Sequence, residues 1–138
     1  MKTYRKTYKP LVGWAIALVA VLLCIAALPL ADGALLTRLT MLATVLMIIL
    51  LMAIIHFGEY AYWINGGPTF EQARDAGSAA RKAYTWAHLR AFLWSGAASA
   101  ALMTVSAIAH WPIGADIVGV CLSVIAAAFS TIRIQFPK

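Results

Sequence analysis

The chain has 138 residues, of which 63% are hydrophobic and 12% are charged, and its net charge is +6. Soluble domains carry about 25% charged residues, so this composition excludes an ordinary soluble domain. The basic residues flank apolar stretches, which indicates membrane topology and contact with anionic lipid. We therefore predict membrane lipid, and no nucleic acid, as a partner.

Four apolar stretches occupy most of the chain, at about 11–30, 39–58, 86–109 and 115–132. A helix needs roughly 20 apolar residues to cross the hydrocarbon core of a bilayer. The pattern predicts an all-α integral membrane protein, with one four-helix transmembrane domain over residues 1–138. The first stretch is longer than the apolar region of about 7–15 residues in a signal peptide, which favours an uncleaved span.

The lysines and arginines are distributed asymmetrically around these stretches. Ten of the eleven fall in segments on one side of the membrane, namely Lys2, Arg5, Lys6, Lys9, Arg74, Arg81, Lys82, Arg90, Arg133 and Lys138. Only Arg38 lies on the other side. Cytoplasmic loops carry the Lys/Arg excess, so both termini are expected in the cytoplasm. The expected location is a bacterial cytoplasmic membrane.

Between the first two spans, Pro29 and the pair Asp32-Gly33 predict a short outside loop at about 31–37. A longer cytoplasmic loop is expected at about 65–85, beginning with the helix-breaking sequence Asn-Gly-Gly-Pro at 65–68. In it, Thr69 and Gln72 have the spacing of a capping box. Apolar and small residues then recur at steps of three and four. This spacing predicts a short amphipathic helix in the loop between spans two and three, lying at the cytoplasmic membrane interface.

Ionisable residues gather at the cytoplasmic ends of the second and third spans. They are His56, Glu59, His88 and Arg90, and we treat them as a possible functional polar cluster. Ionisable groups at membrane depth are candidates for function. A divalent metal site, a haem held by two histidines and a proton relay are open alternatives beside a hydrogen-bonded structural cluster. No cofactor is predicted, and haem or a divalent metal is the alternative.

The third span is rich in small residues, which form two neighbouring stripes. Ser95, Ser99 and Ser106 form one, and Gly96, Ala100, Thr104 and Ala107 form the other. Small residues allow helices to approach closely in lipid, where hydroxyl groups can bond across the contact. The stripes predict either packing inside the bundle or an oligomer interface or pore lining.

Four other polar or reactive positions call for simpler interpretations. His110 and Asp116 flank the outer turn and are expected to be solvated, with Asp116 able to cap the fourth helix. Cys24 and Cys121 lie inside predicted spans, where cysteine behaves as a small apolar residue.

No catalytic motif occurs in the sequence, so we expect a protein that is not an enzyme. The leading hypothesis is a small membrane subunit of a homo-oligomer or of a larger membrane complex. One alternative is a small transporter or channel with His56, Glu59 and His88 at its inner mouth. A haem- or metal-binding redox subunit is a further alternative.

Overall fold

A computed structural model describes residues 4–137 of the protein, and within them it contains helices and no strand. Its elements are α1 (Lys9–Ala26), α2 (Gly33–Phe57), the 3-10 turn η1 (Ala61–Trp63), α3 (Phe70–Asp75), α4 (Gly77–Ile108) and α5 (Ile113–Ile132). The four longest, α1, α2, α4 and α5, are long and apolar enough to cross a membrane. They indicate a membrane protein built as a helical bundle.

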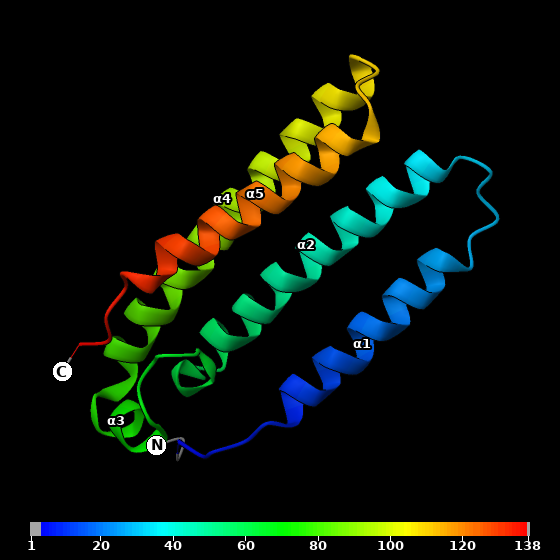
Figure 1. Cartoon of the computed structure of the whole chain (residues 1–138). Helices are drawn as coiled ribbons and strands as arrows, with labels where there is room; N and C mark the ends of the chain where they lie inside the picture. The colour runs from blue at the N-terminus through cyan, green and yellow to red at the C-terminus, as the bar shows by residue number, and fades with distance from the viewer. Residues whose placement is uncertain (1–3, 138) are drawn as a thin grey trace.

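The four long helices run side by side, with α4 and α5 closely paired and α2 between that pair and α1 (Figure 1). Among the described helices, α1 packs only against α2 and has no buried residue. The central core consists of Val45, Met103 and Val120, one each from α2, α4 and α5. Many large apolar side chains point outward, as expected of helices whose solvent is lipid.

Local sequence explains where two helices differ from the predicted spans. The helix α1 ends at Ala26 rather than near position 30, because a residue before proline, here Leu28, disfavours the helical conformation. The helix α2 begins at Gly33 rather than near position 39. The side chain of Asp32 accepts hydrogen bonds from the backbone N–H groups of Ala34 (2.8 Å) and Leu35 (3.2 Å), which caps this early start.

The predicted helix between spans two and three divides into two parts. The capping box of Thr69 and Gln72 forms, but α3 ends at Asp75 after six residues. Gly77 then adopts a φ of +80°, a left-handed conformation that glycine accepts readily, and α4 begins there. With 32 residues, α4 is roughly 48 Å long, longer than the bilayer core of about 30 Å. Its first turns therefore extend beyond a membrane-spanning length.

Both ends of the described chain lie at the same end of the bundle as α3 (Figure 1). There Tyr4, Ile134 and Phe136 pack against a small buried cluster of Ala61, Ala73 and Tyr84. We call this the capped end and the opposite end, with its two short connections, the turn end. The cap ties both terminal segments to the start of α4.

Candidate functional site

The buried face of α4 carries polar residues from its first turns to its last turn, alongside the apolar Tyr84, Leu89 and Met103. Its buried polar residues are Arg81, Thr85, His88, Ser95, Ser99 and Ser106. They are separated by four, three, seven, four and seven residues, a spacing that keeps them on one helical face. We call this set the polar seam. It extends from the capped end to the turn end, between α4 and its neighbours.

At the turn end, the seam meets a buried ion pair between α2 and α5. The Nε of Arg38 lies 2.7 Å from Oδ2 of Asp116, and its Nη2 lies 3.5 Å from Oγ of Ser106. The side chain of Asp116 is 0% exposed and that of Arg38 is 24% exposed. The second carboxylate oxygen, Oδ1, has no hydrogen-bond partner within the described part of the chain.

The expectation that Asp116 would be solvated is therefore wrong. The carboxylate lies in the first turn of α5, but it points inward, because the Arg38 guanidinium offsets the cost of burying its charge. Sequence reasoning missed this pair. The sequence did contain one indication of it. Arg38 is the only Lys or Arg in the segments predicted to lie on the outer side of the membrane, and an arginine in an apolar helix needs an acidic partner.

In the middle of the seam, hydroxyl groups join α4 to α5. Ser95 donates to Oγ of Ser123 at 3.3 Å, and Ser99 and Ser123 share a hydrogen bond of 2.7 Å. These contacts are internal to one chain. The serine stripe of the third span thus packs inside the bundle.

The neighbouring stripe is divided between two environments. Gly96 faces α2, where a Cβ atom at this position would lie 2.5 Å from Cδ1 of Ile49. Ala100, Thr104 and Ala107 are exposed on the surface of the bundle. An interface through these three residues stays a prediction.

At the capped end, Glu59 binds the start of α4, and Arg81 of α4 connects further segments. The Glu59 carboxylate accepts hydrogen bonds from Ser78 (2.6 Å) and Arg81 (2.8 Å from Nε), and Nζ of Lys82 lies 3.7 Å away. Arg81 also donates to the carbonyl of Ala73, and its guanidinium lies 4.0 Å from the ring centre of Tyr4. Arg81 thereby holds the N-terminal segment, the end of α2 and α3 together.

Burial, hydrogen bonds and charge in this cap shift two pKa values. Burial alone would raise the pKa of Glu59, but the hydrogen bonds from Ser78 and Arg81 and the positive charges of Arg81 and Lys82 hold it below 4.5. Burial raises the pKa of Tyr4 to about 12, although the charge of Arg81 opposes the shift. Glu59 also has a φ of 57°, unusual for a residue with a side chain, and its three polar contacts stabilise that conformation.

The side chains of the four residues of the predicted polar cluster contact different groups. Nδ1 of His56 lies 3.1 Å from Oγ1 of Thr85, and Nδ1 of His88 lies 3.0 Å from the carbonyl oxygen of Tyr84. Glu59 binds Arg81, and Arg90 is exposed. Within residues 4–137, no hydrogen bond joins two of these four residues, and no three His, Cys, Asp or Glu residues are placed to share a metal ion.

The arrangement is a polar line with an ion pair at each end, Glu59 with Arg81 and Asp116 with Arg38. Its serines and its threonine can pass hydrogen bonds between neighbouring helices, and its carboxylates can hold charge. Comparisons with protein-family models, with curated proteins and with solved structures find no match for this chain.

Proposed function

We propose that this chain is a small, non-enzymatic integral membrane protein that works as a subunit of a homo-oligomer or of a larger membrane complex. The observation that supports this proposal is the exposed small-residue face of α4, formed by Ala100, Thr104 and Ala107. In lipid, helices associate through small residues that let backbones approach closely. The Thr104 hydroxyl already donates to the carbonyl of Ala100 at 2.8 Å, so this face offers a smooth contact surface.

The position of α1 agrees with this proposal. It has no buried residue and packs only against α2 among the described helices, so most of its surface is free for lipid or another subunit. The polar side chains of the seam, by contrast, are turned inward. The bundle thus presents apolar and small residues outward, which suits association within the membrane.

The experiment is a mass measurement in mild detergent by light scattering coupled to size exclusion. We expect the wild-type protein to elute as an oligomer and the double variant Ala100→Phe/Ala107→Phe to shift to the monomer mass. Ala126→Phe, which places the same side chain on an exposed position of α5, is the matched control and should keep the wild-type mass. A monomeric wild-type protein without bound partner subunits would contradict the proposal.

We also propose that both termini and α3 face the cytoplasm of a bacterial cell, with α3 at the membrane interface. The Lys/Arg asymmetry supports this orientation. Arg38, the exception, is paired with Asp116, so its charge is offset inside the protein. It therefore adds little to the charge balance of the opposite side.

A small transporter or channel is the second candidate, and the observation that favours it is the buried Asp116 carboxylate at the end of the polar seam. A charged group inside a membrane bundle often marks an ion or proton path. The test is proton flux into proteoliposomes under a potassium diffusion potential. Flux above that of protein-free vesicles, reduced in Ser99→Val, would support it, and no flux would count against it.

A further inference from the structure

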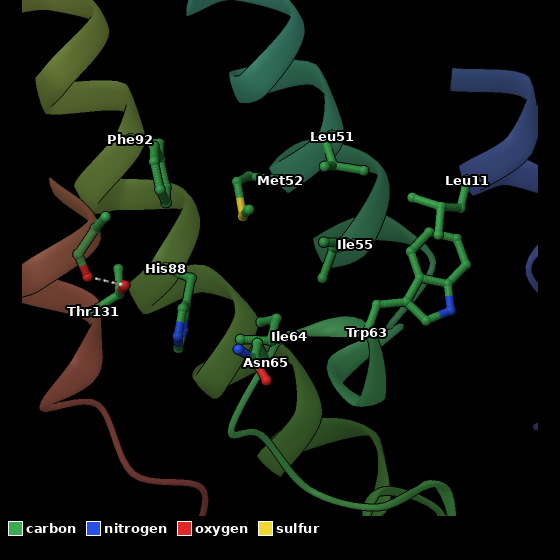
Figure 2. A pocket seen from close by; sticks show the side chains of 11 residues that line it. Leu11, Leu51, Met52, Ile55, Trp63, Ile64, Asn65, His88, Phe92 and Thr131 are labelled. Carbon is green, nitrogen blue, oxygen red and sulfur yellow. Dashed lines mark hydrogen bonds between the residues drawn. The ribbon is translucent and has the colours of Figure 1, made fainter. Parts of the chain in front are cut away.

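A small pocket lies near the capped end, among α1, α2, α4, α5 and the loop after η1. Its volume is about 260 Å³, and most of its walls are apolar, including Leu51, Met52 and Phe92. Its polar lining includes His88 and Asn65. Figure 2 shows the imidazole of His88 extending from α4 beside the loop that carries Asn65. The pocket is distinct from the ion pairs described above.

The hydrogen bond of His88 determines what its ring can offer to this pocket. A carbonyl oxygen only accepts, so Nδ1 must donate its hydrogen to the carbonyl of Tyr84, 3.0 Å away. In the neutral ring, Nε2 is then an acceptor. The residue is 4% exposed, and Nε2 has no hydrogen-bond partner within residues 4–137. An acceptor nitrogen thus belongs to a residue that lines a mostly apolar pocket.

We propose that this pocket binds an amphipathic small molecule whose head is a hydroxylated ring, of the phenol or quinol type. The hydroxyl would donate to Nε2 of His88, and an apolar chain would leave the pocket between the long helices. The volume lies below the range of about 300–1,000 Å³ typical of drug-sized ligands, so it suits one ring and not a porphyrin. Phe92 supplies an aromatic wall for the ring.

The experiment measures equilibrium binding of radiolabelled decylubiquinol to the full chain in nanodiscs. Two variants alter the acceptor: His88→Phe keeps a ring but removes the nitrogen, and His88→Gln offers an oxygen near the position of Nε2. His56→Phe is the matched control, since His56 bonds to Thr85 and does not line the pocket. The di-O-methyl ether of the probe has no hydroxyl donor and is tested on the wild-type protein.

We expect His88→Phe to weaken binding about tenfold, because the hydroxyl donor of the ligand would be buried without an acceptor. His88→Gln should stay within about threefold of the wild type, and His56→Phe should not change binding. The ether should bind the wild type about as weakly as decylubiquinol binds His88→Phe. If the ether and the quinol bind the wild-type protein equally well, or if the quinol does not bind it, the proposal is overturned even where His88→Phe fails to fold. The oligomer mass is a separate readout, so this result does not depend on the proposed function.

Discussion

In the Arg38–Asp116 ion pair, each charge is stabilised by the other. Asp116 is fully buried, and its Oδ2 lies 2.7 Å from Nε of Arg38. Breaking a buried pair by removing one charge costs about 3–5 kcal/mol, because the other charge is left uncompensated. Removing both charges avoids that cost.

We therefore expect Asp116→Leu to lower the free energy of unfolding by about 3 kcal/mol, since Arg38 would stay in an apolar environment without its partner. The double variant Arg38→Leu/Asp116→Leu should be more stable than Asp116→Leu alone. Unfolding in mixed micelles with increasing dodecyl sulfate measures the free energy of unfolding of both variants. Equal losses in the single and double variants would show that the pairing has no energetic role.

The Glu59–Arg81 contact predicts a pH dependence of stability. Because the folded protein holds the pKa of Glu59 below 4.5, its contribution is fully present above that value and is lost as pH falls through the folded pKa. We expect Glu59→Gln to lower the free energy of unfolding at pH 7 by about 2 kcal/mol, the scale of a charged hydrogen bond. The difference from the wild type should shrink as the pH is lowered toward 3.

Thermal unfolding in detergent across this pH range is the measurement. Glu71→Gln, the same substitution on the exposed side of α3, is the control and should leave the melting temperature unchanged. A difference between wild type and Glu59→Gln that stays constant from pH 7 to pH 3 would mean that the ionised carboxylate contributes nothing.

At the level of elements, the contact between α2 and α4 depends on the small size of Gly96. A Cβ atom there would lie only 2.5 Å from Cδ1 of Ile49 and 3.6 Å from Cγ1 of Val45. A leucine would therefore push the two helices apart in the region of the central core. The effect arises within one chain, so it reports on bundle packing and not on oligomerisation.

We expect Gly96→Leu to destabilise the bundle by about 1–3 kcal/mol, the usual cost of overpacking. Gly13→Leu is the matched control, because a Cβ at Gly13 in α1 meets no atom within 4 Å. Dodecyl sulfate titration of both variants beside the wild type is the measurement. A Gly96→Leu protein as stable as Gly13→Leu would contradict the close contact between α2 and α4.

At the level of the whole molecule, the proposed orientation can be tested by labelling single cysteines from outside intact cells. After Cys24 and Cys121 are replaced by alanine, Ala31→Cys at the turn end should react with an impermeant maleimide. Arg5→Cys at the capped end should react only after the membrane is permeabilised, because the basic segments stay in the cytoplasm. Labelling of Arg5→Cys in intact cells would show that the capped end lies outside the cell and would contradict the proposed orientation.

The sequence by itself determined the class of this fold. Long apolar stretches can satisfy their backbone groups in lipid only as helices, and four such stretches predicted four long helices. Local rules also predicted the capping box of Thr69 and Gln72, which forms. The starts of α2 and α4 differed from prediction, since Asp32 extends one helix and Gly77 begins the other earlier.

Only the tertiary structure decided which polar groups meet. We predicted that His56, Glu59 and His88 could form one cluster, yet each bonds to a different partner. Arg38 and Asp116 are 78 positions apart, and their pairing depends on how α2 packs beside α5. Helical periodicity fixes which residues share a face, but the rotation of each helix in the bundle arises from long-range packing that no local pattern encodes.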